Sequence, residues 1–166
     1  VEHGYDILKI ASASFTDWPV LEEAAKTSLP IVASTAGASV QEIDRVASFL
    51  TNRAKDFALM HCVAAYPTAN ADLQLNRIDM LVNRYQGITV GYSTHENPDN
   101  MVAVQMAVAK GARILERHVG IGTPDAPLND YSSSPDTVGT WVQAIERALE
   151  MCGRTDRNFV PVPAEL

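Results

Sequence analysis

Cysteine is scarce in this chain. Its 166 residues include two cysteines, Cys62 and Cys152, which are too few for the disulfide framework that stabilises small secreted domains. Both lie in apolar stretches, one at the end of a predicted strand and one near the end of a predicted helix. We therefore expect two buried free thiols in place of a disulfide bridge.

Basic residues and long apolar runs are also scarce. Lysine and arginine together number 13 against 20 acidic residues, which gives a net charge of −7. Nucleic-acid surfaces need clustered basic residues, so this balance argues against a nucleic-acid partner but leaves room for a local basic site that binds a small anion. No apolar run approaches the roughly 18 residues of a membrane span, and no segment resembles a signal peptide. We expect a cytoplasmic protein without a membrane partner.

The chain does have a regular alternation of strand and helix patterns. With 46% apolar and 20% charged residues it has the composition of a soluble globular domain, and it is long enough for one sizeable core. Five β-rich runs each end in a polar residue and lead into a helical pattern. The runs are residues 5–12, 30–35, 57–62, 88–95 and 113–118. The helices are expected at about 16–27, 39–50, 75–85, 100–110 and 134–149.

This alternation predicts a parallel sheet with right-handed crossovers, and therefore an α/β protein. In such a sheet, polar residues that follow the strands gather at one edge, where (β/α) enzymes carry their chemistry. We predict that residues 1–153 form this unit and that residues 154–166 form an extended tail or linker. The inward face of the last helix is expected to comprise Val138, Trp141, Val142, Ile145 and Leu149.

Two histidines, His95 and His118, lie at the ends of consecutive predicted strands. Neighbouring strands are about 4.8 Å apart, so the two imidazoles can converge on one divalent ion and leave positions open for water and substrate oxygens. Such an ion can polarise a carbonyl group as a Lewis acid. The alternative is that each histidine is an ordinary polar residue at a strand end.

Lys9 lies inside an apolar run, where its charge is costly unless something matches it. A phosphate or carboxylate in a strand-end cavity would do so, whereas a lysine on an edge strand can instead extend its ammonium group into solvent. Glu116 is expected on the same strand face as His118, with Arg117 on the other face. Glu116 can orient a ligand histidine, neutralise Lys9, or form an interior ion pair with no catalytic role.

Serines close three of the predicted strands, at Ser12, Ser34 and Ser93. Their hydroxyls, together with the amides of the following helix starts, can bind phosphate oxygens, although serine is also common as a helix N-cap. His61 is next to Cys62, and at least one of these two side chains must face the helices.

The loop after the last strand contains the run Asn129-Asp130-Tyr131-Ser132. In a (β/α) barrel this loop overhangs the site, so a polar contact with substrate is one interpretation. A turn stabilised by Asn and Asp side chains is the other.

The strand ends resemble, in chain order, those of the sialic acid synthases, a family that includes spore coat polysaccharide synthase-like members. The resembling segments are LKIAS at 8–12, IVASTAG at 31–37, LMHCVAAYP at 59–67, VGYSTHE at 90–96 and LERHVG at 115–120. The typical forms in the family are KIAS, IISTGM, LLHCTSAYP, GLSDHT and IEKHFT. The resemblance covers about residues 5–150, nearly the whole chain.

The resemblance implies a (β/α)8 TIM barrel, of which this chain corresponds to the fourth through eighth strands. It also implies a transferase of sialic acid or polysaccharide biosynthesis. The family condenses phosphoenolpyruvate with an N-acetylated amino sugar to a nine-carbon 2-keto acid and releases phosphate. The resemblance further implies a homo-oligomer, with a dimer as the expected form.

For individual residues, the resemblance implies that His95 and His118 hold a divalent metal. Mn²⁺ is the expected ion, with Mg²⁺ or Co²⁺ as alternatives. Lys9 matches a catalytic and substrate-binding position, and Tyr66 lies near the substrates. The matching positions for the phosphate and carboxylate of phosphoenolpyruvate are Lys9, Ser12, Ser34 and Ser93.

The chain departs from the family pattern on the sugar side. Thr94 replaces the aspartate before the first metal histidine, and PLNDYSSSP replaces the GPDHxFS stretch, which leaves Asn129 or Asp130 as the candidate sugar contact. These changes indicate a different sugar acceptor. Two alternatives stay open: a related metal-dependent barrel aldolase, and a non-catalytic barrel module, which the missing first three strands motivate. The aldolase is less favoured because no strand-end lysine is free of carboxylates.

Overall fold

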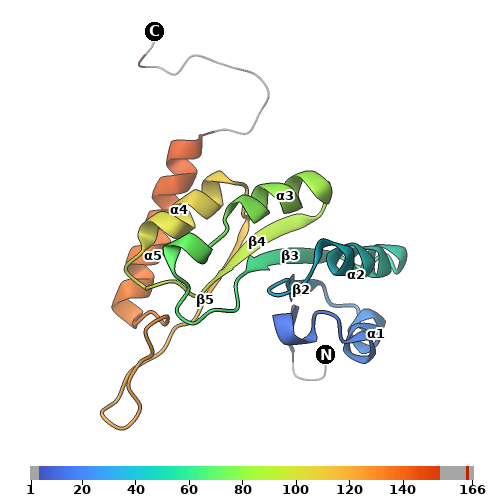
Figure 1. Ribbon diagram of the computed structural model, residues 1–166, viewed down its shortest axis with the longest axis horizontal. Coiled ribbons are helices and arrows are strands. Elements are labelled where there is room, and N and C mark those ends of the chain that lie inside the picture. The colour runs from blue at the N-terminus through green and yellow to red at the C-terminus, as the bar shows by residue number, and fades with distance from the viewer. Residues whose placement is uncertain (1–3, 154–163, 165–166) are drawn as a thin grey trace.

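The computed structural model describes residues 4–153 and residue 164. Its five strands form one parallel sheet in chain order. They are β1 (Leu8–Ile10), β2 (Ile31–Ser34), β3 (Phe57–Cys62), β4 (Thr89–Thr94) and β5 (Ile114–Arg117). The predicted parallel α/β architecture is confirmed, and the sheet curves as a partial barrel (Figure 1). The predicted tail at 154–166 lies outside the described residues, apart from residue 164.

Helices connect the strands and lie around the outer side of the sheet (Figure 1). They are α1 (Trp18–Lys26), α2 (Val40–Asn52), α3 (Asn76–Arg84), α4 (Met101–Ala109) and α5 (Pro135–Cys152). Two short 3-10 helices, η1 (Ser12–Ser14) and η2 (Asn70–Asp72), precede α1 and α3. Among the described residues, no helix lies on the inner, concave face of the sheet (Figure 1).

The helix starts are fixed by side-chain caps. Ser39 and Glu42 form the predicted capping box: the Glu42 amide donates to Ser39 Oγ at 3.3 Å, and the Ser39 amide donates to Glu42 Oε2 at 2.8 Å. Ser134 caps α5 by accepting from the Thr137 amide, with Pro135 in the first turn. Because these caps set where each helix begins, they also fix the path of the loops that leave the strand ends.

The main core lies between the sheet and the outer helices. Leu59 and Tyr92 point outward from β3 and β4 and, like Leu50, Ile78 and Leu81 of the helices, are almost fully buried. A smaller cluster joins α4 to α5 through Val104, Trp141 and Ala144. Successive strand residues point to opposite faces, so the residues between these core positions are directed at the concave face.

The predicted inward face of α5 is partly wrong. Trp141 is buried against Val104 of α4, but Val142 and Leu149 are 45% and 49% exposed. The buried side of a helix is set by the neighbour it contacts, and α5 turns only the Trp141 side toward α4. Cys152 is exposed at the last turn of α5, so the prediction of two buried thiols holds for Cys62 alone.

The first strand is shorter than predicted. Its pairing with β2 begins where the Leu8 amide donates to the Pro30 carbonyl, and Ile7 is 55% exposed. β2 itself begins at Ile31, so residues 5–7 have no β2 residue opposite them. At the other end, Ser12 already belongs to η1.

Candidate functional site

The carboxyl ends of the five strands bring the predicted site residues to one edge of the sheet. Lys9 comes from β1, Ser34 ends β2, Ser93 comes from β4 and Glu116 from β5. In the register of the sheet Ser93 is directly opposite Glu116, and Cys62 is directly opposite Ser93. Because all strands run in the same direction, these side chains share the concave face at the edge where (β/α) proteins carry their sites.

His95 and His118 follow β4 and β5 and face each other. Their ring centroids are 5.1 Å apart, with the rings tilted by 59°. His95 Nδ1 lies 2.9 Å from the carbonyl oxygen of Val63. A carbonyl only accepts hydrogen bonds, so Nδ1 carries the proton and Nε2 keeps its lone pair free for a ligand. Burial lowers the pKa of His95, which favours the neutral ring that a metal needs.

Glu116 is bound on both oxygens. Lys9 Nζ lies 2.5 Å from Oε2, and Ser93 Oγ donates to Oε1 at 2.7 Å. Burial acts to raise the pKa of Glu116, but these two hydrogen bonds and the charge of Lys9 outweigh it and the pKa is lowered. Of the roles left open by the sequence, the structure therefore shows Glu116 neutralising Lys9. The Lys9 side chain is 35% exposed despite this pairing.

The three predicted serines differ in what they bind. Ser12 Oγ accepts a hydrogen bond from the Ala36 amide at 3.1 Å, and Ser93 Oγ is committed to Glu116. Ser34 Oγ is buried and has no hydrogen-bond partner within the described part of the chain. A buried hydroxyl without a partner is uncommon and costly, so this oxygen is available to a ligand on the concave face.

Cys62 and His61 point to opposite faces of β3. The Cys62 thiol lies within the site, with its Sγ 3.8 Å from His95 Nδ1, and burial raises its pKa. His61 faces the helices: its Nε2 lies 2.8 Å from the Leu73 carbonyl and its ring stacks on Tyr92. The expectation that at least one of the two faces the helices is confirmed for His61.

Two tyrosines pack against the histidines. The ring centroid of Tyr66 lies 4.2 Å from that of His95, and the Tyr131 centroid lies 5.3 Å from that of His118. The two tyrosine rings are themselves 5.2 Å apart. Tyr66 was expected near the site from its segment. Tyr131 belongs to the loop run that was expected to overhang the site, but its contact with the histidines was not predicted. An aromatic residue within a loop of small and polar residues was the one available signal for it.

Asn129 and Asp130 lie in the same loop and are both exposed. Asn129 Oδ1 accepts from the Tyr131 amide at 3.2 Å, which is the side-chain turn that the sequence left open. This turn immediately precedes Tyr131, whose ring contacts the rings of both histidines.

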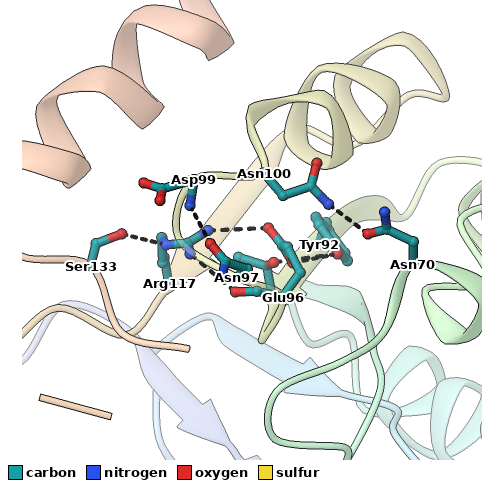
Figure 2. A network of polar contacts seen from close by, with 9 residues as sticks. Asn70, Tyr92, Glu96, Asn97, Asp99, Asn100, Arg117 and Ser133 are labelled. Atoms are coloured by element: carbon teal, nitrogen blue, oxygen red, sulfur yellow. Dashed lines mark hydrogen bonds and ion pairs between the residues drawn. The ribbon is translucent and has the colours of Figure 1, made fainter. Parts of the chain in front are cut away.

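A buried ion pair lies directly behind the histidines, and sequence reasoning did not identify it. Arg117 Nη1 is 3.1 Å from Glu96 Oε1, and each side chain is 1% exposed. Figure 2 shows the pair within a network that reaches Tyr92, whose hydroxyl donates to Glu96 Oε2, and Ser133, whose Oγ accepts from Arg117 Nε. The sequence placed Arg117 on the correct strand face but gave no reason to pair it with Glu96.

The site offers a metal two nitrogen ligands. Within residues 4–153, no group of three or more His, Cys, Asp or Glu side chains is arranged to hold a metal ion. An ion held by His95 and His118 would therefore take its other ligands from water, from substrate or from protein outside the described residues.

In the described part of the chain, no helix has both the length and the apolarity that crossing a lipid bilayer requires.

Comparison with known proteins agrees with this arrangement. A model described as the NeuB family matches residues 1–157. The N-acetylneuraminate-9-phosphate synthase of Drosophila melanogaster is 40% identical over 112 residues, which make up 67% of this chain and 30% of that protein.

Solved structures give the same result. A Chromobacterium violaceum protein named as spore coat polysaccharide biosynthesis protein E is 48% identical, with a TM-score of 0.94 over 99% of this chain and 48% of that one. The N-acetylneuraminic acid synthetase of Leptospira borgpetersenii, solved in complex with citrate, is 30% identical, with a TM-score of 0.88 over 99% of this chain and 56% of that one. This chain thus spans about half the length of these solved chains and less of the insect enzyme. From the family match over residues 1–157 and from these relatives, we conclude that the chain belongs to the NeuB family.

Proposed function

We propose that this chain supplies the histidine-bearing half of the active site of a phosphoenolpyruvate-dependent synthase. Its substrates would be phosphoenolpyruvate and an N-acetylated amino sugar, and its product a nine-carbon 2-keto acid. The observation that carries the proposal is the pairing of His95 and His118, 5.1 Å apart, at the same sheet edge as Lys9. Because the chain spans about half of its solved relatives, the activity is proposed for the whole protein that contains it.

The anionic substrate fits the β1–β2 side of the concave face. Lys9 supplies a positive charge whose side chain is 35% exposed, and Ser34 supplies a buried hydroxyl that lacks a protein partner. A carboxylate or phosphate oxygen would bind both through charge-assisted hydrogen bonds. The Leptospira relative was solved in complex with citrate, which is a small polyanion as phosphoenolpyruvate is.

The metal fits the other side of the same face. His95 and His118 would hold the divalent ion, with Mn²⁺ expected and Mg²⁺ or Co²⁺ as alternatives. His95 suits this role because its Nδ1 proton is bound to Val63, its Nε2 has no hydrogen-bond partner among the described residues and its pKa is lowered by burial. When bound, such an ion supplies Lewis-acid polarisation of the aldehyde oxygen of the open-chain sugar.

The proposed reaction forms one carbon–carbon bond and releases one phosphate. C3 of phosphoenolpyruvate bonds to the aldehyde carbon of the sugar, whose oxygen becomes a hydroxyl, and the oxygen of a water molecule adds to C2. The bond between C2 and the phosphate oxygen then breaks, so one phosphoenolpyruvate, one sugar and one water give one keto acid and one phosphate. In this scheme Lys9, whose charge Glu116 already neutralises, donates a hydrogen bond to an anionic oxygen of phosphoenolpyruvate. Tyr66 and Tyr131 pack against the histidine rings.

The contacts of Lys9 argue against an imine-forming aldolase. A Schiff-base lysine must present a neutral amine, which requires desolvation or nearby positive charge. Lys9 instead lies 2.5 Å from the Glu116 carboxylate and its side chain is 35% exposed, so neither condition is met. Among the other described lysines, Lys26 and Lys110 are paired with carboxylates and Lys55 donates to a carbonyl, all away from the histidines.

The test is phosphate release by the complete protein. We expect release to require phosphoenolpyruvate, an N-acetylated amino sugar and a divalent metal together, and to fall by about 10³-fold or more in His95→Ala and His118→Ala. His61→Gln is the matched control, because His61 faces the helices and glutamine can keep the hydrogen bond to Leu73. Phosphate release that is insensitive to metal chelation would contradict the proposal. Binding of phosphoenolpyruvate without any product would favour a non-catalytic module.

The expected dimer stays a prediction, for which sedimentation of the same sample is the measurement.

A further inference from the structure

Glu96 and Arg117 are the chain neighbours of the two histidines, Glu96 directly after His95 and Arg117 directly before His118. They point to the helix side of the sheet, away from the concave face, and their side chains are each 1% exposed. We propose that the Glu96–Arg117 pair is a positioning device that fixes the relative placement of the two histidines and of the loop that carries Tyr131. The inference rests on the proposed function, in which these histidines hold a divalent cation.

A buried ion pair is poor evidence for stability, because removing two charges from water costs about as much as their attraction returns. Apolar residues of similar volume would fill the same space. The pair instead fixes the orientation of the groups bound to it, because a guanidinium group is planar and donates its hydrogen bonds in fixed directions. Arg117 uses three nitrogens: Nη1 donates to Glu96 Oε1, Nη2 to the Glu96 main-chain oxygen at 3.2 Å, and Nε to Ser133 Oγ at 2.6 Å.

The end of β4 is fixed by these contacts. The bond from Arg117 Nη2 to the Glu96 carbonyl holds the main chain one residue beyond His95. On its other side, Glu96 Oε2 accepts from the Tyr92 hydroxyl at 2.9 Å, so the carboxylate is held from β4 as well as from β5. The His95 carbonyl accepts from the Thr68 amide at 2.9 Å, which ties the same point to the loop that carries Tyr66.

The loop that carries Tyr131 and Ser133 is fixed through the same arginine. Ser133 Oγ accepts from Arg117 Nε, and the Ser133 amide donates to the His118 carbonyl at 2.9 Å. The Gly120 amide returns a bond to the Ser133 carbonyl at 3.0 Å. Tyr131 lies two residues before this anchor, with its ring 5.3 Å from that of His118. One guanidinium therefore connects the ends of β4 and β5 with the loop, as Figure 2 shows for its side-chain partners.

The experiment compares four forms of the complete protein, labelled with ¹⁵N in the histidine rings. They are the wild type, Arg117→Lys, the paired variant Glu96→Gln/Arg117→Met, and the control Asp44→Asn/Arg84→Met. The paired variant leaves no unpaired buried charge, and Arg117→Lys keeps the charge but loses the fixed donor geometry. The control removes the exposed Arg84–Asp44 pair, which joins α2 to α3 away from the site.

Two quantities are measured. The first is the exchange rate of the His95 Nδ1 proton without metal, which reports whether its bond to Val63 is held. The second is the Mn²⁺ dissociation constant by calorimetry. We expect the paired variant to fold, to exchange this proton about 10-fold faster or more, and to bind Mn²⁺ about 10–100-fold more weakly, the range typical for residues that orient metal ligands. Arg117→Lys should fall in between, and the control should match the wild type.

A folded paired variant with both quantities within about twofold of wild type would overturn the proposal. If the paired variant does not fold, Arg117→Lys decides by the same two criteria. If the wild type binds no Mn²⁺, the metal in the proposed function fails, yet the proton-exchange rate still tests whether the pair positions His95. The two failures are therefore distinguishable.

Discussion

The ammonium group of Lys9 lies 2.5 Å from a carboxylate oxygen of Glu116, and this contact joins the first and last strands of the sheet. Adjacent strands lie about 4.8 Å apart, so in a flat sheet the two strands would be separated by roughly 19 Å. The contact therefore requires the curvature of the sheet. It places a cation on the concave face at the height of Ser93, which binds the same carboxylate.

Replacing Lys9 with methionine should cost phosphoenolpyruvate affinity far more than stability. The two side chains are 35% and 43% exposed, and ion pairs with such access to water contribute about 1 kcal/mol or less. Loss of the charge beside a bound anion should raise the KM for phosphoenolpyruvate about 10-fold or more. Steady-state kinetics and thermal unfolding of one preparation check this, with Lys26→Met, in the exposed Lys26–Glu23 pair, as the control. An unchanged KM would count against the assignment of Lys9.

Ser34→Ala should leave the free protein as stable as wild type, or more stable by about 1 kcal/mol. The Ser34 hydroxyl is buried without a partner in the described residues, and burying an unsatisfied hydroxyl is unfavourable. The same change should weaken phosphoenolpyruvate binding about 10-fold, because a ligand oxygen loses its donor. Urea denaturation and calorimetry measure the two effects. A destabilised protein with normal affinity would show that the hydroxyl serves the fold.

Stability should fall as the pH decreases below the ordinary histidine pKa of 6.5. Burial is the main cause that lowers the pKa of His61, so the unfolded chain takes up this proton at higher pH than the folded protein does. The unfolded state then binds more protons below 6.5, and the free energy of unfolding decreases through that range. Above about pH 7.5 both states are neutral at His61 and its contribution is constant.

Urea midpoints measured from pH 8 to 5 test this dependence. The lowered pKa of His95 acts in the same direction, so His61→Gln should reduce the slope without removing it. Stability that rises between pH 6.5 and 5.5 would have the wrong sign for both histidines.

Gly91→Ala should destabilise the sheet, and Gly139→Ala should not. A Cβ on Gly91 would clash with the Met60 side chain and approach the Ile114 carbonyl oxygen at 2.5 Å. Methionine can move, but the carbonyl belongs to β5, so we expect a loss of about 1–3 kcal/mol. Gly139 in α5 has nothing within 4 Å of an added Cβ, and alanine there should gain about 0.5–1 kcal/mol. Thermal unfolding of both variants gives the comparison, and equal effects would refute the packing argument.

Patterns that repeat along the chain predicted the fold well. The alternation of strands and helices gave the parallel sheet, and the helix caps at Ser39 and Ser134 were read directly, because both signals depend on residues close in sequence. The strand ends also led to His95, His118 and Lys9. Strand alternation placed Glu116 on the same face as His118, and an ion pair with Lys9 was one of the roles left open for it.

Features that depend on distant neighbours were missed. The Glu96–Arg117 pair needs the register of β4 against β5 and the path of the chain after β4, neither of which a single strand encodes. Tyr131 reaches the histidines through a loop without periodicity. Val142 and Leu149 carry an apolar helical pattern, but which of its residues are buried depends on where α4 lies. In each case tertiary packing, and not local propensity, decides the outcome.

Lys9 and Glu116 are 107 residues apart along the chain, and this separation affects when their contact forms during folding. Each strand pairs with the strand that follows it, so the sheet can grow one βα unit at a time, and each step closes only a short loop. The Lys9–Glu116 contact can form only when the fifth strand has been added to the first four. It is therefore a late event, and substitutions at either residue should speed unfolding while leaving the rate of folding unchanged.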